Sequence, residues 1–181
     1  MNEHLNVLEL VAERLEQSNI QYMISGSIAM NYYAQPRMTR DIDIVVELVL
    51  DDVKGLTALF MPDFYIDEEM VLNAIQNQGF FNIIHNELLV KIDFIVRKNA
   101  PYRRQEFLRR QRVKVDGFKA WIVSAEDLLL SKLVWAKESQ SEMQLNDVRN
   151  LIASVHQLDW SYLNHWATEL TITNMLSKVR Q

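Results

Sequence analysis

Two aspartates, Asp41 and Asp43, stand one residue apart inside an apolar run. In a β-strand, residues two apart point to the same face, so both carboxylates would share one face while Ile42 and Ile44 enter a core. Like charges at this spacing repel each other and resist burial. A divalent cation removes that penalty, because Mg²⁺ takes oxygen ligands and is commonly held by one or two carboxylates together with substrate phosphates. The pair therefore predicts a metal site.

A Gly-Ser pair, Gly26 and Ser27, precedes these aspartates, and thirteen residues separate Ser27 from Asp41. It stands at the start of a predicted helix, where free backbone N–H groups attract phosphate. The glycine permits close backbone approach, and the serine hydroxyl is a further hydrogen-bonding group. The ordinary alternative is a strand–helix turn with a serine cap. With the aspartates, the pair predicts a site for a metal ion and a triphosphate.

Asp93 is a third carboxylate, and it interrupts the apolar run LLVKIDFIV. If a strand over residues 88–96 lies beside a strand over 40–47, all three acids meet on one face of the sheet. They would then supply ligands for two metal ions, one that binds the triphosphate and one that lowers the pKa of an attacking hydroxyl. The alternative is a surface acid on an edge strand.

The order of a strand, Gly-Ser, a spacer of about a dozen residues and Asp-x-Asp on a second strand resembles the defining motif of the DNA polymerase β-like nucleotidyltransferase superfamily. The local form Arg37-x-Thr39-x-Asp41-Ile-Asp43 is similar to the abortive-infection type IV toxin nucleotidyltransferases and their bacterial relatives. The resemblance implies that Asp41 and Asp43 bind metal, Mg²⁺ or Mn²⁺. It also implies that Asp93 contacts the catalytic metal and acts as general base.

The same resemblance makes Gly26 and Ser27 the phosphate-gripping turn. It assigns Arg37 and Thr39 to nucleotide binding, with a structural ion pair beneath the metal site as the alternative.

A second part of the toxin resemblance covers the Ser124-Ala-Glu-Asp-Leu segment, with Lys132 downstream, and Asp147 on a later helix. Lys132 falls on the apolar stripe of its helix and so needs a partner, either a substrate phosphate or Asp147. The resemblance implies a catalytic role for Lys132 and a substrate-binding role for Asp147. The resembled toxins have an Arg shortly before this Asp, and residues 141–147 contain none.

Periodicity and turn signals predict an α/β (α+β) fold that ends in a C-terminal helical bundle. The resemblance implies that the part before this bundle is a mixed-sheet nucleotidyltransferase core with helices on one face. We place the core at residues 1–123 and the helical region at 124–181. Strands are expected over 20–25, 40–47, 64–66, 80–85, 88–96, 113–115 and 118–123. Helices are expected over 3–18, 27–34, 51–60, 68–78, 102–110, 124–137, 142–155, 159–169 and 171–179.

Composition excludes several classes. The chain of 181 residues has no cysteine, which excludes disulfides and thiol nucleophiles and suits a reducing cytoplasm. No signal peptide or membrane-spanning run is apparent, and a net charge of −5 argues against wholesale coating of nucleic acid. Residues 97–114, however, hold eight of the 19 basic residues, and this stretch fits either an RNA acceptor or a solvated helix face. Trp135, Trp160 and Trp166 fit helix packing better than base stacking.

The leading hypothesis is a metal-dependent nucleotidyltransferase that moves a nucleotidyl group from a nucleoside triphosphate to an acceptor hydroxyl. The toxin resemblance favours an RNA or tRNA 3′ end as acceptor and implies an antitoxin protein as partner, while small molecules and proteins are acceptors for the same core. The alternative is a catalytically silent nucleotide-binding or antitoxin-like module, which would be free to lose its acids. The sequence does not reveal the nucleotide, the acceptor or the oligomeric state.

Overall fold

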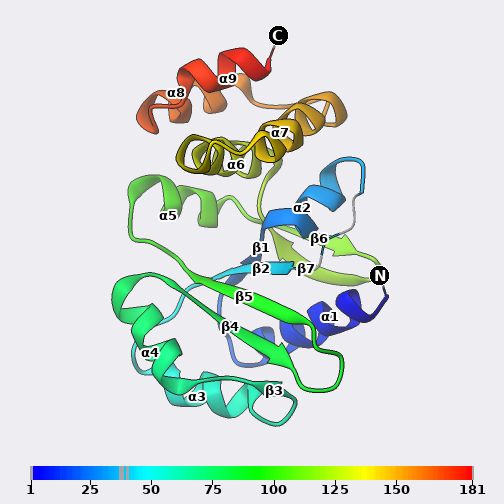
Figure 1. Cartoon of the computed structure of the whole chain (residues 1–181), viewed down its shortest axis with the longest axis vertical. Coiled ribbons are helices and arrows are strands. Elements are labelled where there is room, and N and C mark those ends of the chain that lie inside the picture. Colours follow the sequence, from blue (N-terminus) through cyan, green and yellow to red (C-terminus); the bar gives the residue numbers. More distant parts are fainter. Residues whose placement is uncertain (1, 37–38, 40, 181) are drawn as a thin grey trace.

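A mixed seven-stranded sheet lies between two groups of helices (Figure 1). The computed structural model describes residues 2–36, 39 and 41–180. The strand order is β3-β4-β5-β2-β1-β7-β6. Strands β2 and β5 pair in parallel, as do β1 and β7, and the remaining neighbours are antiparallel. The predicted mixed α/β fold is confirmed.

The elements follow the predicted order with small shifts at their ends. The strands are β1 Tyr22–Ile24, β2 Asp41–Val46, β3 Phe64–Tyr65, β4 Phe80–His85, β5 Lys91–Val96, β6 Gln111–Val115 and β7 Phe118–Ile122. The helices in the described residues are α1 Asn2–Gln17, α2 Gly26–Tyr33, α3 Asp52–Phe60, α4 Glu68–Asn77, α5 Pro101–Leu108, α6 Ala125–Ser139, α7 Glu142–Ser154, α8 Trp160–Glu169 and α9 Thr173–Val179.

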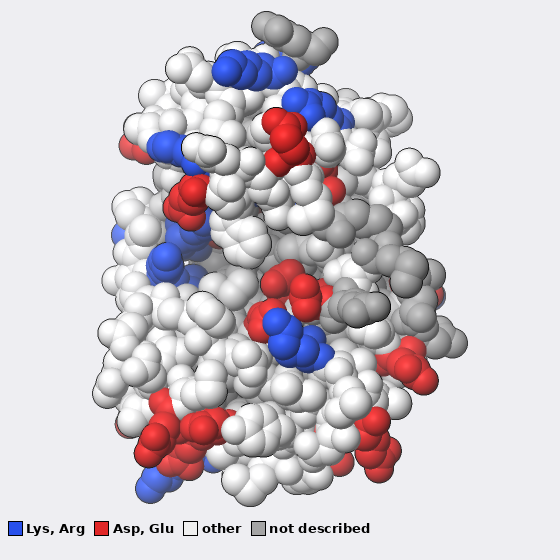
Figure 2. All heavy atoms as spheres, viewed as in Figure 1, with Lys and Arg blue, Asp and Glu red and all other residues white. Residues whose placement is uncertain are grey.

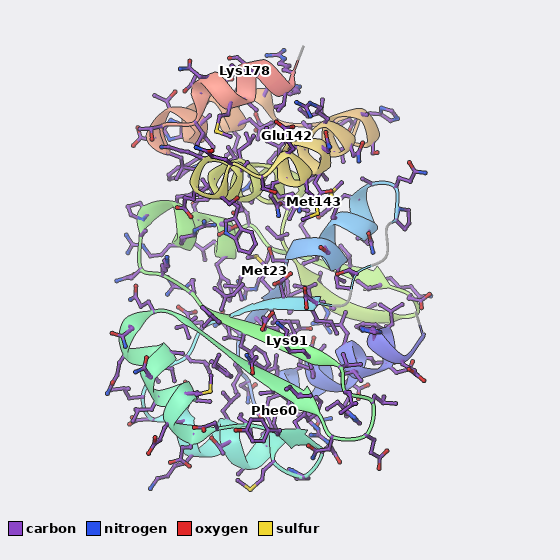
Figure 3. All side chains as sticks on the ribbon, viewed as in Figure 1. Met23, Phe60, Lys91, Glu142, Met143 and Lys178 are labelled. Carbon is purple, nitrogen blue, oxygen red and sulfur yellow. The ribbon has the colours of Figure 1, made fainter. Side chains whose placement is uncertain are left out.

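The central strands β2 and β5 alternate between a buried face and a more open face. Their buried side chains are Ile42, Ile44 and Val46 in β2, and Ile92, Phe94 and Val96 in β5. This face packs against the lower helices of Figure 1, where the ring centroids of Phe60 and Phe94 lie 5.8 Å apart (Figure 3). Because side chains alternate along a strand, the two-residue spacing of the acids puts them on the opposite, open face.

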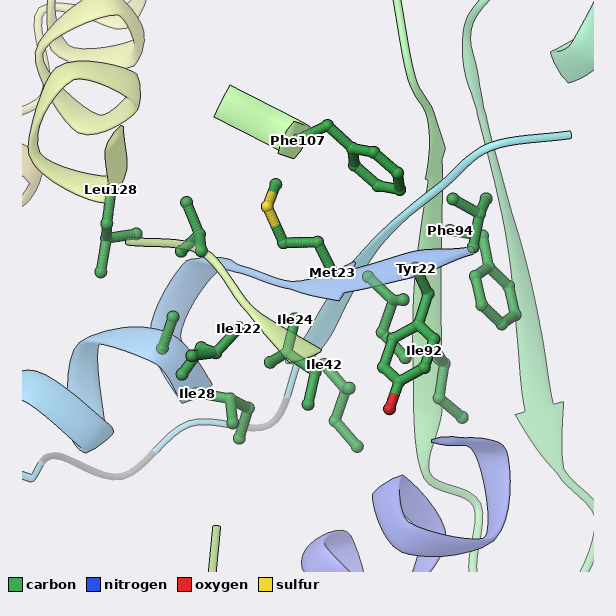
Figure 4. Close-up of a cluster of buried hydrophobic side chains, with 14 of the residues drawn as sticks. Tyr22, Met23, Ile24, Ile28, Ile42, Ile92, Phe94, Phe107, Ile122 and Leu128 are labelled. Atoms are coloured by element: carbon green, nitrogen blue, oxygen red, sulfur yellow. The ribbon is translucent and has the colours of Figure 1, made fainter. Parts of the chain in front are cut away.

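Strand β1 is buried on both faces, so the sheet is covered from both sides at this position. Figure 4 shows Met23 pointing toward Phe107 of α5, whereas Tyr22 points to the other side. In Figure 1, α1, α3 and α4 lie on one side of the sheet, and α2, α5 and the C-terminal helices lie on the other. Helices α2 and α5 and the C-terminal helices therefore cover the sheet around β1, and the open face of β2 and β5 lies beside them.

The C-terminal helices begin at a capped terminus. Ser124 is the N-cap of α6, and its Oγ accepts a hydrogen bond from the Asp127 N–H at 3.2 Å, as a capping residue does. Buried hydrophobic side chains from α1 to α9 form one contiguous cluster. A boundary between residues 123 and 124 therefore stays a prediction. No helix in the described part of the chain is long and apolar enough to span a membrane.

Candidate active site

The register of β2 and β5 sets the positions of the three predicted acids. Asp43 lies directly opposite Asp93, and Asp41 lies opposite Lys91. The expectation that these two strands are neighbours is confirmed, and it brings the acids to one face. Asp41 is the most exposed of the three, with 62% of its side chain accessible, against 20% for Asp93.

Lys91 shares a strand face with Asp93, as their two-residue spacing predicts, and its ion pairs with the acids were not predicted. Its Nζ is 2.8 Å from Asp93 Oδ2 and 3.7 Å from Asp41 Oδ1. The hydrogen bond to Asp93 and the negative charges of the acids raise the pKa of Lys91 against the effect of its burial. Figure 3 labels Lys91 on β5, and Figure 2 shows, in the same view, a basic side chain against a group of acidic ones. The ammonium group thus neutralises part of the charge that the sequence assigns to a metal ion.

The surroundings of Asp43 disfavour its ionised form. Burial raises its pKa, and the charges of Asp93 and Asp41 raise it further. The charge of Lys132 and a hydrogen bond from the Ser27 backbone N–H lower the pKa, but the net direction is upward. The protein therefore holds this carboxylate where a further cation would stabilise its ionised form.

Gly26 is required by the close approach of α2 to Asp43. Its φ of +57° is left-handed, and a Cβ at this position would lie 1.9 Å from Asp43 Oδ2. A side chain would therefore be strained and would displace the carboxylate. The Ser27 N–H, which the sequence assigns to phosphate, donates to Asp43 in this structure. The Gly-Ser turn and the acids thus form one unit, as their spacing suggests.

Lys132 is paired with Asp147, which is one of the two partners that the sequence allows. Its Nζ donates to Asp147 Oδ2 at 2.7 Å and to Gln144 Oε1 at 3.1 Å, and the Lys132 and Asp147 side chains are only 6% and 5% exposed. Gln144 lies in the segment where the resembled toxins have an Arg. Lys132 also lines the cleft described below and is near enough to lower the pKa of Asp43. The ion pair is shown, and a role toward phosphate stays a prediction.

The remaining predicted residues are less informative. Thr39 Oγ1 donates to the Asp41 carbonyl at 3.2 Å, which fixes the chain just before β2. Thr39 is not among the residues that line the cleft. Arg37 lies outside the described residues, so its predicted contact with nucleotide stays a prediction.

A cleft of about 650 Å³ extends from Asp43 and Asp93 across the open face of the sheet, and Asp41 is not among the residues that line it. Its volume is in the range of small-molecule sites. The floor is formed by Val45, Phe80, Asn82, Asp93 and Ile95, and α5 and α6 supply the walls. Gly26, Ser27, Asp43, Lys91, Lys132, Arg103, Glu106, Ser131 and Trp135 also line it. Trp135, expected in helix packing, is 50% exposed.

The basic stretch does not form one surface. Arg109 pairs with Asp127 and Glu126, and Arg112 pairs with Glu16. The Arg110 guanidinium lies over the rings of Phe107 and Trp121. These three arginines have partners within the chain, so the stretch does not present all of its charge on one surface, and its role toward RNA stays a prediction.

The donor set fits a divalent ion that is completed by substrate. Within the described part of the chain, no group of three or more acidic or histidine side chains is already arranged to hold a metal ion. Asp43 and Asp93 lie opposite each other, and Mg²⁺ is usually held by one or two carboxylates plus substrate phosphates. The raised pKa of Asp43 is the observation in favour, because burial and the charges of Asp93 and Asp41 destabilise its ionised form, which a cation would stabilise.

Comparison with known proteins identifies the class. Residues 3–181 match the family described as nucleotidyltransferase of unknown function (DUF6036), and the chain belongs to that family. The predicted membership of the nucleotidyltransferase superfamily is thereby confirmed. No curated protein matches the chain in sequence.

Several solved structures share the fold. The ANT(2″)-Ia protein in complex with adenylyl-2″-tobramycin matches with a TM-score of 0.61 and 15% identity, over 98% of this chain and 99% of that one. An antigenic nucleotidyltransferase-like protein from Paracoccidioides brasiliensis matches with a TM-score of 0.60 and 20% identity, over 98% and 92%. The lincosamide antibiotic adenylyltransferase LnuA, with lincomycin bound, matches with a TM-score of 0.56 and 13% identity, over 86% and 98%. At these identities the likeness concerns the fold.

Proposed function

We propose that this protein transfers a nucleotidyl group from a nucleoside triphosphate to an acceptor hydroxyl, with Mg²⁺ or Mn²⁺ as cofactor and with release of pyrophosphate. The observation that carries the proposal is the unit of Gly26, Asp43 and Asp93. A left-handed glycine lets α2 begin against Asp43, and Asp43 lies opposite Asp93 at one end of a cleft. Family membership supports the same class of reaction.

Each residue has a role in this scheme. Asp41 and Asp43 would hold a cation that neutralises triphosphate charge, and together with Asp93 they would hold a second cation that acidifies the acceptor hydroxyl. Asp93 accepts the proton of that hydroxyl. The acceptor oxygen then bonds to the α-phosphorus, and the bond from the α-phosphorus to the pyrophosphate oxygen breaks. Lys132 faces the cleft beside Asp43 and offsets negative charge on the phosphates.

We further propose an RNA or tRNA 3′ end as the acceptor, in a cytoplasmic protein of the toxin–antitoxin kind. The motif from Arg37 to Asp43 and the helix with Lys132 support this assignment through their resemblance to the toxin enzymes. The retained Asp41, Asp43 and Asp93 favour an active enzyme over a silent nucleotide-binding or antitoxin-like module, which would not need them.

The test is incorporation of label from each of the four nucleoside triphosphates into total RNA, protein or small metabolites, with Mg²⁺ present. We expect one labelled product class with the wild-type protein. The Asp93→Asn variant should bind triphosphate with wild-type affinity but lose turnover, because its proton acceptor is gone. An Asp93→Asn variant that transfers at the wild-type rate would contradict the scheme.

A further inference from the structure

The cleft has a second end that the proposed transfer chemistry does not use. This end, which we call the α5 wall, consists of Lys98, Arg103 and Glu106, with Ser131 and Trp135 of α6 beside them. All five residues line the cleft. No local sequence pattern joins them, because they come from a loop and two helices.

Arg103 is held in place by a buried network. Its Nη1 donates to Glu106 Oε2 at 2.8 Å and to Ser131 Oγ at 2.6 Å, and Ser131 Oγ donates to Glu106 Oε1 at 2.5 Å. The hydrogen bonds found for this guanidinium among the described residues all start from Nη1. Donors on Nε and Nη2 therefore remain for a ligand, on a side chain that is 26% exposed. A guanidinium fixed in this way is preorganised to bind an anion.

The charge of the α5 wall is positive. Its one acid, Glu106, is 4% exposed, and both of its carboxylate oxygens are already occupied by Arg103 and Ser131. Lys98 is exposed and adds a second cation at the same end of the cleft. The wall therefore attracts anions and repels a polycation such as an aminoglycoside.

Two aromatic side chains accompany these cations. Trp135 is 50% exposed and Phe80 is 69% exposed, and both line the cleft. Exposed rings beside cations are the combination that binds single-stranded nucleic acid, because any base stacks on a ring while the cations contact the backbone.

The Lys98 end of the α5 wall is too far from the acids to serve the phosphates of the donor triphosphate. Arg97 follows Asp93 by four residues in extended chain, which is about 13 Å at the rise of a strand. Lys98 comes one residue later, and the next helix, α5, begins at Pro101. The three phosphates of a triphosphate form a much shorter row, and the reacting one must lie at the acids. A phosphate bound at Lys98 therefore belongs to another molecule.

We propose that the α5 wall is the acceptor subsite and binds the unpaired 3′-terminal region of an RNA strand. Arg103 and Lys98 contact backbone phosphates, and Trp135 stacks on a base. This inference rests on the proposed nucleotidyl transfer and adds the residues that recognise its acceptor.

The test is binding of a fluorescein-labelled single-stranded RNA to the full chain without metal or triphosphate, measured by anisotropy at several salt concentrations. Lys98→Ala and Trp135→Ala each remove one proposed contact at an exposed side chain. Arg103→Lys keeps a charge near Glu106 but loses the planar fork. The matched controls are Lys119→Ala and Tyr65→Ala, which remove an exposed cation and an exposed ring outside the cleft.

We expect Trp135→Ala to weaken RNA binding about tenfold or more. Lys98→Ala should reduce the slope of log affinity against log salt by about 0.7. Both should bind Mg²⁺–triphosphate with wild-type affinity, and the two controls should bind RNA normally. Because this assay needs no turnover, a lack of transfer activity would contradict the proposed reaction without contradicting the binding of RNA at the α5 wall.

Three results would overturn the acceptor subsite. Equal RNA binding by the cleft variants and the controls would show that the wall does not contact RNA. A loss of triphosphate affinity in Lys98→Ala would assign the wall to the donor nucleotide. A mononucleotide that binds as tightly as the RNA would identify a small nucleotide as the ligand instead of a strand end.

Discussion

At the scale of single residues, the negative charge of Asp43 should destabilise the metal-free protein. The pKa of Asp43 is raised by burial and by the charges of Asp93 and Asp41. A raised carboxyl pKa means that the folded protein binds this proton more tightly than the unfolded chain does. Ionisation of Asp43 therefore lowers the free energy of unfolding as the pH rises above 3.8, the ordinary pKa of an aspartate.

We therefore expect Asp43→Asn to raise the melting temperature of the metal-free protein at pH 7. The gain should shrink as the pH falls and vanish below the ordinary aspartate pKa, where wild-type Asp43 is protonated in both states. Thermal melts of both proteins from pH 3 to pH 8 in chelator measure this. A variant that is less stable than wild type at pH 7 would show that Asp43 contributes a favourable interaction that we have not recognised.

Lys91 is the second residue with a measurable consequence, because its ammonium lies 2.8 Å from Asp93 and 3.7 Å from Asp41. Lys91→Met should cost at most about 1 kcal/mol in chelator, since the lysine is 41% exposed and surface ion pairs are weak. Mg²⁺ should then raise the melting temperature of the variant more than that of wild type, because the ion no longer competes with the ammonium. Equal Mg²⁺ shifts in the two proteins would count against competition at these acids.

At the scale of elements, the Lys132–Asp147 ion pair links α6 to α7. Variants of this pair can test whether Lys132 has a structural role or a functional one. The buried pair with Asp147 predicts that Lys132→Met, which removes the ammonium partner of a buried carboxylate, lowers the free energy of unfolding by roughly 3–5 kcal/mol. Lys132→Met with Asp147→Leu should recover much of this loss, since apolar residues can replace a buried ion pair. Denaturant unfolding of wild type, both single variants and the double variant gives the coupling.

The same four proteins test the role toward phosphate. If Lys132 also offsets phosphate charge, the double variant stays weak in triphosphate binding although its stability has returned. Normal triphosphate affinity in the folded double variant would restrict Lys132 to holding the helices together.

Most elements could be predicted from local pattern. The two-residue alternation around Asp41–Asp43 and Asp93 is enough to place the acids on one strand face, and it does not depend on distant contacts. Ser124 capping α6 and the Asp116-Gly117 turn between β6 and β7 are likewise local signals, and both are present. The strand expected from residue 88 begins at Lys91, and Leu89 has a φ of +53° that belongs to the preceding turn.

At the scale of the whole molecule, the unpredicted features all depend on contacts between distant parts of the chain. Lys91 meets Asp41 only because β2 and β5 pair in one register. Arg103 and Ser131 are 28 residues apart, and Trp135 is half exposed because the cleft opens beside α6. The partners of the basic stretch depend on distant contacts in the same way, since Arg109 pairs with acids of α6 and Arg112 pairs with an acid of α1.

The central claim is that the acids hold a triphosphate through a divalent cation. Calorimetric titration of the wild-type protein with each nucleoside triphosphate, once with Mg²⁺ and once with excess chelator, tests it most directly. We expect at least one nucleotide to bind with Mg²⁺ and to lose its affinity in chelator, because uncompensated carboxylates at Asp43 and Asp93 repel the triphosphate. Equal affinity with and without the metal would contradict the site as described.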